Sequence, residues 1–188
     1  MCLKSRGFFA IFLILMSILS ILCFEDSAIF EEEDIYKQAL PVDPNLNQTG
    51  LTIPGTKWCG PGDTASNYND LGSQRETDMC CRTHDNCPNI ILPSGNKNGL
   101  QNPDYFTRLS CECEQEFLNC LQRVNNYASI AMGKAYFTLR QFCFKNEHPQ
   151  KECASYQEGM IRKRCVRYKL DKTKPKKWQW FDIPYFTK

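Results

Sequence analysis

The segment from Cys80 to Cys87 reads Cys-Cys-Arg-Thr-His-Asp-Asn-Cys, so it combines a histidine and a carboxylate with three cysteines. On a helix, Cys80 and His84 would be one turn apart, and a disulfide at Cys80 would fix the backbone beneath the imidazole. Adjacent Cys80 and Cys81 would point about 100° apart and must bond to different segments. Rigid positioning of this kind suits a histidine that transfers protons as a general base. Taken alone, His84 is more often a structural histidine and Asp85 a solvated charge.

The stretch 54–62, Pro-Gly-Thr-Lys-Trp-Cys-Gly-Pro-Gly, is rich in glycine and proline. Glycine allows backbone carbonyls to turn toward one point, which suits a hard cation such as Ca²⁺ with oxygen ligands at about 2.3–2.6 Å. Such a loop offers little charge, so the cation would also need a carboxylate. Asp85 is a candidate if Cys59 is bonded near it. In isolation, the same stretch is more typical of a plain turn.

Glu114 follows a Cys-Glu-Cys sequence at 111–113 and is the candidate partner of the histidine. On a helix, Cys113 and Cys120 lie seven residues apart and therefore share one face. If these cysteines bond to the helix that carries His84, Glu114 comes close to the imidazole. A carboxylate there could orient the ring and stabilise its protonated form.

The N-terminus and the cysteine count both indicate an exported protein. Two basic residues, Lys4 and Arg6, precede an apolar run from Phe8 to Phe24, which predicts a secretory signal peptide over residues 1–24. The alternative is an uncleaved anchor, although a membrane span needs about 20 apolar residues. Removal of the leader leaves ten cysteines, an even number. This count predicts five disulfides in a secreted, extracellular protein rather than a zinc site.

Charge is distributed unevenly along the rest of the chain. Residues 25–50 contain seven acidic residues, one lysine and no cysteine, which is typical of an acidic propeptide or flexible lead-in. An N-glycosylation sequon at Asn47 lies in this segment. Residues 51–188 contain 20 basic and 14 acidic residues, and ten of the basic residues fall in 159–188. In an exported protein, this basic segment is expected to face an anionic membrane surface or an acidic partner, and no nucleic acid.

Apolar spacing and chain punctuation predict three helical segments within a single domain over residues 51–188. The first helix is expected over 78–87, capped by Thr77 and stopped by Pro88. The second is expected over 106–124, where one apolar stripe recurs at helical spacing. A weaker third helix is expected over 127–142, followed by loops and a short hairpin. The predicted fold class is mainly α and disulfide-rich, with two long helices cross-linked by disulfides, a glycine-rich calcium loop and a small β/loop C-terminal region.

Several separated motifs occur in the order of one known family. The Cys-Cys-x-x-His-Asp-x-Cys helix at 80–87, the Trp-Cys-Gly-x-Gly loop at 58–62 and the Ser-Cys-Glu-Cys stretch at 110–113 together resemble the group III secreted phospholipases A2, the bee-venom type. The resemblance extends over about residues 51–188 and includes Gly-Lys-Ala-Tyr-Phe at 133–137, Glu-His-Pro at 147–149 and Gln-Trp-Phe-Asp at 179–182. All ten cysteines beyond the predicted signal peptide fall on the pattern of that family.

The resemblance implies the phospholipase A2 fold and a calcium-dependent enzyme that hydrolyses the sn-2 ester of glycerophospholipids to free fatty acid and lysophospholipid. His84 would be the general base that takes a proton from water, Glu114 would orient it, and Tyr136 would support Glu114. The implied Ca²⁺ ligands are the carbonyls of Trp58, Gly60 and Gly62 and the carboxylate of Asp85. The implied disulfides are Cys59–Cys81, Cys80–Cys120, Cys87–Cys113, Cys111–Cys143 and Cys153–Cys165. The implied partner is a phospholipid membrane surface, anionic surfaces included, and no stable protein partner is implied.

Glu114 departs from the family pattern, which has aspartate at this position. The extra methylene moves the carboxylate oxygens by roughly 1.5 Å, and a misplacement of that order can cost about 10²-fold in rate. An alternative hypothesis is therefore a weakly catalytic or non-catalytic toxin or receptor-binding protein on the same scaffold. A purely structural disulfide domain is a third hypothesis, but intact His84 and Asp85 beside a complete glycine loop argue against it.

Two segments near the C-terminus allow two interpretations each. Arg162-Lys163-Arg164 is either a processing site or an uncut basic loop. Trp178, Trp180 and Phe181 lie among lysines and form either an interfacial patch or part of the core.

Overall fold

The computed structural model describes residues 52–188, which contain three helices and eight strands. The helices are α2 (Arg75–Asp85), α3 (Cys111–Val124) and α4 (Tyr127–Leu139). The predicted signal peptide (1–24), the acidic lead-in (25–50) and the sequon at Asn47 lie outside the described residues. Within 52–188, no helix combines the length and the apolar composition needed to cross a membrane.

Helix α2 begins and ends slightly earlier than the predicted range of 78–87. Thr77 is an interior residue of the helix rather than its cap, and its hydroxyl donates to Asn126 Oδ1 at 2.8 Å. The helix ends at Asp85 because Cys87 precedes Pro88, and a residue before proline avoids the helical backbone conformation. The last turn of α2 therefore carries the candidate histidine.

Helix α3 starts at 111 rather than at 106, because the preceding residues form a strand. Strand β4 (Arg108–Leu109) pairs antiparallel with β1 (Ile90–Ile91). Ser110 then caps the helix, and its Oγ accepts the N–H of Cys113 at 3.4 Å. Asn125 ends the helix in the left-handed conformation, with φ of 49°.

Helix α4 starts with a capping box in which the side chains of Asn126 and Ser129 each accept the other's backbone N–H. It ends at Leu139, three residues before the predicted end, because the chain is extended from Phe142 onward. Its start and type agree with the prediction of a helix over 127–142.

The C-terminal part contains more strand than the sequence patterns predict. Its strands are β5 (Phe142–Glu147), β6 (Gln150–Gln157), β7 (Arg164–Leu170) and β8 (Lys177–Asp182), and a small hairpin earlier in the chain pairs β2 (Asn96–Lys97) with β3 (Leu100–Gln101). All sheets in residues 52–188 are two-stranded and antiparallel, with β5 beside β8 and β6 beside β7. The pairing of β5 with β8 places Phe142 opposite Asp182, and such long-range pairing leaves no short-range signal in the sequence.

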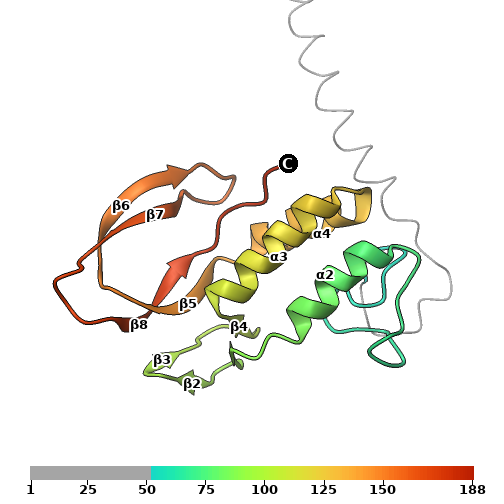
Figure 1. The fold of residues 1–188 in the computed structure, drawn as a ribbon, viewed down its shortest axis with the longest axis horizontal. Helices are drawn as coiled ribbons and strands as arrows, with labels where there is room; N and C mark the ends of the chain where they lie inside the picture. Colours follow the sequence, from blue (N-terminus) through green and yellow to red (C-terminus); the bar gives the residue numbers. More distant parts are fainter. Residues whose placement is uncertain (1–51) are drawn as a thin grey trace, which may run out of the picture. The chain divides into compact units, whose positions relative to one another are not determined.

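The predicted mainly α, disulfide-rich fold with two long helices is therefore confirmed only in part. The three helices have 11, 14 and 13 residues, and the strands together contain nearly as many residues as the helices. Figure 1 shows α2 and α3 side by side, α4 behind α3, and strands β5–β8 on the other side of α3. The buried core lies between these helices and β8, where Phe117, Leu121, Phe137 and Phe181 meet.

Five disulfides cross-link the described chain, in the pairing that the resemblance implies. The bonds are Cys59–Cys81, Cys80–Cys120, Cys87–Cys113, Cys111–Cys143 and Cys153–Cys165. Two of them attach α2, through Cys81 to the loop before it and through Cys80 to α3, and a third attaches Cys87, two residues after α2, to α3. The fourth attaches α3 to β5, and the fifth joins β6 to β7.

Arg164 is a fully buried cation that ties the end of α4 to the C-terminal segment. Its exposed fraction is 0 %, and its guanidinium donates to the carbonyls of Phe137, Thr138 and Ile183 at 2.5–3.0 Å. Arg162 pairs with Asp182 at 2.7 Å. A protease that recognises Arg164 would need this region to unfold, which favours the uncut loop over the processing site.

The aromatic residues of β8 contribute to the core more than to a surface patch. Phe181 is buried, whereas Trp178 and Trp180 are half-buried and lie with ring centroids 5.9 Å and 6.0 Å from the buried ring of Phe144. The tryptophans keep only part of their surface available to an interface.

Substitution Arg164→Gln should lower the free energy of unfolding by about 3 kcal/mol, because three buried carbonyls lose a charged donor. Urea unfolding of the oxidised protein measures this change. Arg167→Gln is the matched control, because Arg167 lies on the same strand and is exposed. The control should change the unfolding free energy by less than about 0.5 kcal/mol. Equally small effects of both substitutions would contradict the structural role of Arg164.

Candidate active site

His84 is held on two sides by aromatic rings. It is 8 % exposed, and its ring stacks on Phe117 with centroids 4.2 Å apart and an interplanar angle of 28°. The ring of Tyr136 meets it edge-on at 4.9 Å. These contacts come from three different helices, so the imidazole has one well-defined orientation, with each ring nitrogen facing a different group.

The hydroxyl of Tyr136 connects His84 to Glu114. It donates to Glu114 Oε1 at 2.9 Å and lies 3.0 Å from His84 Nε2. A hydroxyl has one proton to donate, so the Nε2–H of neutral His84 donates to the tyrosine oxygen. The hydrogen-bond partners thus assign the tautomer with an unprotonated Nδ1. Nδ1 is therefore free to accept a proton.

Glu114 acts on the histidine through Tyr136 rather than directly. Its Oε2 lies 3.6 Å from His84 Nε2, which is an ion-pair distance but too long for a good hydrogen bond. The sequence predicted that these three residues come together, and the structure brings them together. The sequence could not predict that the hydroxyl oxygen of Tyr136 lies between His84 and Glu114, because this depends on where the longer side chain of Glu114 ends.

The electrostatics of this cluster favour a protonated imidazole. Burial by itself disfavours the imidazolium, but the hydrogen bonds and charges of Asp85 and Glu114 outweigh it, so the pKa of His84 lies above its ordinary value of 6.5. Burial and the charge of Glu114 hold the pKa of Tyr136 well above 10, so its hydroxyl remains a donor. Glu114 is 4 % exposed, and its Oε2 has no hydrogen-bond partner in the described chain. A second proton on His84, at Nδ1, would give this buried oxygen a charged partner.

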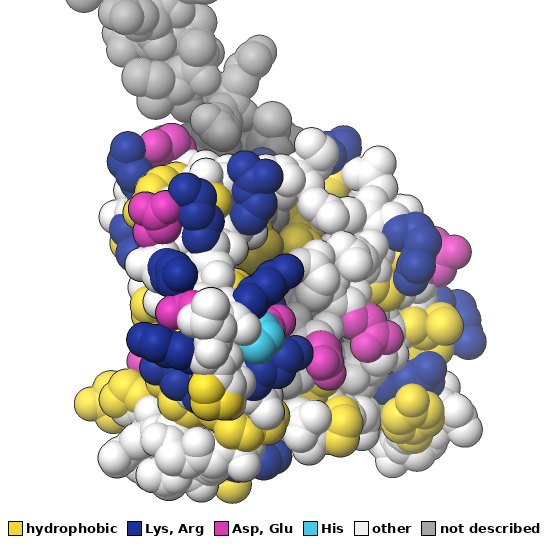
Figure 2. Space-filling view, turned by 60° about the vertical axis from the view of Figure 1, so that its left-hand side comes forward, with side chains coloured by type: hydrophobic (Ala, Val, Ile, Leu, Met, Phe, Trp, Pro, Cys, Tyr) yellow, Lys and Arg dark blue, Asp and Glu magenta, His cyan; other side chains and the backbone are white. Residues whose placement is uncertain are grey.

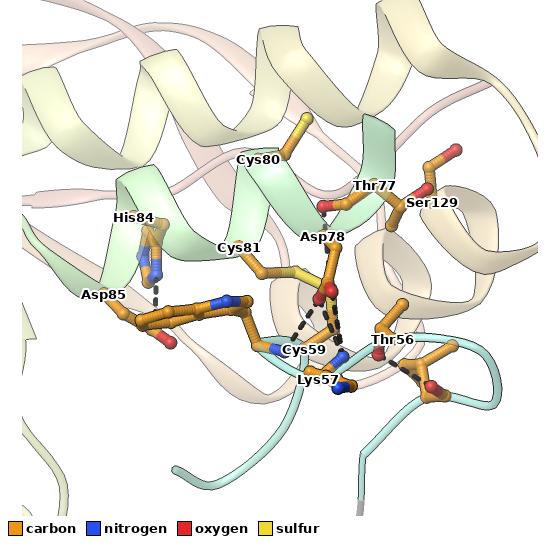
Figure 3. Close-up of a disulfide and its surroundings, with 12 residues drawn as sticks. Thr56, Lys57, Cys59, Thr77, Asp78, Cys80, Cys81, His84, Asp85 and Ser129 are labelled. Carbon is orange, nitrogen blue, oxygen red and sulfur yellow. Dashed lines mark hydrogen bonds and ion pairs between the residues drawn. A yellow bond between two sulfur atoms is a disulfide. The ribbon is translucent and has the colours of Figure 1, made fainter. Parts of the chain in front are cut away.

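The other ring nitrogen faces Asp85 and the glycine-rich loop. Nδ1 of His84 lies 3.6 Å from Asp85 Oδ1. Figure 3 shows both side chains on the side of α2 that faces the loop, where Cys81 bonds to Cys59. The sequence made Asp85 a candidate cation ligand on the condition that Cys59 is bonded near it. The Cys59–Cys81 disulfide meets this condition.

The loop carbonyls that were expected to bind a cation accept no hydrogen bond within residues 52–188. They belong to Trp58, Gly60 and Gly62. The carbonyls of Lys57 and Cys59, by contrast, accept the N–H groups of Thr64 and Ile53, each at 2.8 Å. Three unused carbonyls together with the carboxylate of Asp85 would make a donor set of the kind that a hard cation prefers. Burial raises the pKa of the Asp85 carboxyl, which a cation would reverse.

No cluster of three or more His, Cys, Asp or Glu side chains in residues 52–188 is placed to hold a metal ion. A cation at the loop would therefore be held mainly by backbone oxygens. The carbonyl of Pro61 also accepts no hydrogen bond within residues 52–188.

Asp78 is a site-forming residue that the sequence patterns did not reveal. Its carboxylate has an exposed fraction of 0 % and accepts the N–H groups of Lys57 at 2.9 Å, Trp58 at 2.7 Å and Gly72 at 2.7 Å. Figure 3 shows it between α2 and the loop. The available signal was an acid on the cysteine-bearing face of α2, three residues before Cys81.

Comparison with known proteins decides the family of this chain. Residues 52–147 match a family model described as Phospholipase A2. A phospholipase A2 of Bombus pensylvanicus is 46 % identical over 135 residues, which cover 71 % of this chain and 98 % of the relative. A phospholipase A2 of Apis mellifera is 46 % identical over 144 residues, covering 76 % of this chain and 84 % of the relative. The chain belongs to the phospholipase A2 family. An acidic phospholipase A2 of Heloderma suspectum is 41 % identical over 96 residues, covering 50 % of this chain and 68 % of the relative. The bee and bumblebee relatives confirm the resemblance to the group III type.

Asp78→Asn should lower the free energy of unfolding by about 2–4 kcal/mol. The NH₂ group of asparagine would face a backbone N–H group in the buried site, and neither donor would have an acceptor. Urea unfolding measures the loss. Glu76→Gln is the control, since Glu76 is an exposed acid on the same helix, and it should cost less than about 1 kcal/mol. A loss for Asp78→Asn as small as that of the control would contradict its role in holding the loop.

The tautomer of His84 is directly observable. In ¹⁵N-labelled protein at a pH above the titration of His84, the nitrogen shifts should show a protonated Nε2 and an unprotonated Nδ1. In Tyr136→Phe, the Nε2–H loses its acceptor, and the proportion of the other tautomer should rise. A proton on Nδ1 in the unmodified protein would contradict the hydrogen-bond assignment.

Proposed function

We propose that this chain is a secreted, calcium-dependent phospholipase A2 that hydrolyses the sn-2 ester of glycerophospholipids to a free fatty acid and a lysophospholipid. Membership of the phospholipase A2 family identifies the enzyme class. The observation that carries the finer assignment is the unprotonated Nδ1 of His84, which faces Asp85 and the loop with unused carbonyls.

The proposed chemistry follows from the two sides of the imidazole. Nδ1 of His84 takes a proton from a water molecule as the water attacks the ester carbonyl. The imidazolium that forms keeps its Nε2–H bond to Tyr136 and gains the ion pair with Glu114 Oε2. The same proton then passes to the departing alcohol oxygen, which returns His84 to its neutral form. The buried cluster thus stabilises the histidine at the point where it carries charge.

The residues at the loop support the calcium assignment. The carbonyls of Trp58, Gly60 and Gly62 and the carboxylate of Asp85 would hold the ion. Ca²⁺ would supply Lewis-acid polarisation of the ester carbonyl and charge for the substrate phosphate. Hydrogen bonds to Asp78 and the Cys59–Cys81 disulfide hold the loop against α2, so its carbonyls would need little rearrangement to bind the ion.

The surface and the cysteines support a function at extracellular lipid surfaces. Exposed lysines lie over the strand region, namely Lys151, Lys169, Lys172, Lys174, Lys176 and Lys177. Figure 2 shows Lys and Arg side chains spread over one face of the molecule, with Asp, Glu and hydrophobic side chains between them. Such a surface suits anionic lipid. Five disulfides are typical of an oxidising, extracellular compartment.

Purified, oxidised protein should release fatty acid and lysophospholipid from mixed phospholipid vesicles in the presence of Ca²⁺, and mass spectrometry should place the cleavage at the sn-2 ester. A chelator should abolish the release, and re-addition of Ca²⁺ should restore it. His84→Gln should lower the rate at least about 10³-fold with folding intact. Absence of hydrolysis by folded protein with Ca²⁺ would contradict the proposal and favour a non-catalytic binding protein on this scaffold.

A further inference from the structure

A cleft of about 1010 Å³ lies between α3 and the strands β5, β7 and β8. Figure 1 shows these strands on the side of α3 opposite helix α2, which carries His84. Of the residues in the catalytic cluster, only Glu114 borders the cleft, and its oxygens are directed to Tyr136 and His84. The volume matches the upper end of the range of about 300–1,000 Å³ that is typical of small-molecule sites. The cleft is therefore large enough for a ligand of its own.

The walls of the cleft carry an elongated apolar surface. Val166, Tyr168 and Leu170 stand on alternate residues of β7, and all three line the cleft. Opposite them lie Leu118 of α3 and Phe181 of β8, and the ring of Phe181 meets that of Tyr168 edge-on at 5.1 Å. The three residues of β7 extend over about 13 Å of strand. A surface of this shape suits an extended hydrocarbon chain better than a compact ring system.

Lys145 of β5 is the half-buried cation of the cleft. Its Nζ lies 4.4 Å from the ring centroid of the buried Phe181. Within residues 52–188, this ammonium group makes no hydrogen bond and no ion pair, so its only close partner is the face of an aromatic ring. The other two basic residues that border the cleft, Arg123 and Lys176, are exposed. A partly desolvated ammonium group gains most from an anionic ligand.

The acidic residues around the cleft do not neutralise Lys145. Glu147 and Asp182 each pair with another basic residue, at 3.5 Å and 2.7 Å. Glu112 and Glu116 border the cleft from α3, and both are exposed. Their charges repel an anion on the α3 side. An anionic head is therefore directed toward Lys145 on the strand side.

We propose that this cleft binds a long-chain carboxylate, with the carboxylate paired to Lys145 and the hydrocarbon chain along Val166, Tyr168 and Leu170. Binding at this cleft goes beyond the proposed function, because no bond is broken and His84 takes no part. A fatty acid is also the product of the proposed hydrolysis, so the protein would meet this ligand at high local concentration. The cleft would then hold released fatty acid apart from the catalytic cluster.

Calorimetry with saturated fatty acids tests the proposal. A chelator is present, so that neither calcium soaps nor hydrolysis contributes. The oxidised protein should bind decanoate at a single site, and the affinity should rise about threefold for each methylene added from octanoate to dodecanoate.

Two lysine variants test the pairing with the carboxylate. Lys145→Gln should weaken the binding of decanoate about tenfold, the usual value of one charged hydrogen-bonding contact, and should leave the binding of the neutral decanol unchanged. Lys169→Gln is the matched control, because Lys169 is exposed on β7 and does not line the cleft. The control should bind decanoate like the unmodified protein.

A variant of the wall and an NMR measurement locate the ligand. Val166→Asp places a negative charge beside the hydrocarbon chain and should weaken the binding of decanoate at least about tenfold. Val166 is 43 % exposed, so the variant should still fold. In ¹⁵N-labelled protein, decanoate should shift the amide signals of Leu118, Val166 and Tyr168 and leave that of His84 unchanged. Dodecylphosphocholine, a zwitterion with one chain, should bind more weakly than dodecanoate.

Four outcomes would overturn the inference. The first is absence of decanoate binding by the folded protein, which would leave the proposed hydrolysis intact. The second is an equal loss of affinity in Lys145→Gln and Lys169→Gln, which would indicate a general charge effect. The third is a set of amide shifts centred on His84, which would assign the fatty acid to the candidate active site. The fourth is tighter binding of dodecylphosphocholine than of dodecanoate, which would assign the cleft to lysophospholipids.

Discussion

The disulfides on helix α2 are the constraint on which the candidate site depends. Cys81 bonds the helix to the loop before it and Cys80 bonds it to α3, while Cys87, two residues after its end, also bonds to α3. Because Cys80 and Cys81 are adjacent, they leave the helix in different directions, and the helix can neither rotate nor slide without breaking a bond. His84, Asp85 and the loop carbonyls therefore keep one arrangement. The same bonds restrict the unfolded chain, which stabilises a small domain with a limited core.

The two buried carboxylates, Asp78 and Glu114, have different roles in the candidate site. Asp78 accepts three backbone N–H groups and has no mobile partner, so its charge is satisfied permanently and fixes the loop. Glu114 accepts one bond from Tyr136 and keeps Oε2 without a hydrogen-bond partner in the described residues. Its charge is fully satisfied only when His84 is an imidazolium, with protons on both ring nitrogens. Burial makes both carboxylates strong electrostatic partners, one for structure and one for a transient charge.

The tyrosine between His84 and Glu114 explains how the longer acid is accommodated. A direct carboxylate–imidazole hydrogen bond would need the oxygens closer than the observed 3.6 Å. The hydroxyl of Tyr136 is within 3.0 Å of both groups and fills this gap. Glu114 therefore keeps a connection to the histidine, which weakens the case for a scaffold that has lost catalysis.

The sequence by itself determined the groups whose relation is local. The spacing of His84, Asp85 and the cysteines of α2 depends only on helix geometry, and the glycine loop is contiguous, so both could be assigned from the chain. The family motifs also implied the five disulfides. Only the tertiary structure decided the rest, because those contacts join distant segments. It paired β5 with β8, which corrected the mainly α prediction. It also buried Asp78 beneath the loop and placed Tyr136 between two catalytic candidates. Each of these depends on which side chains meet after packing, and no local pattern records that.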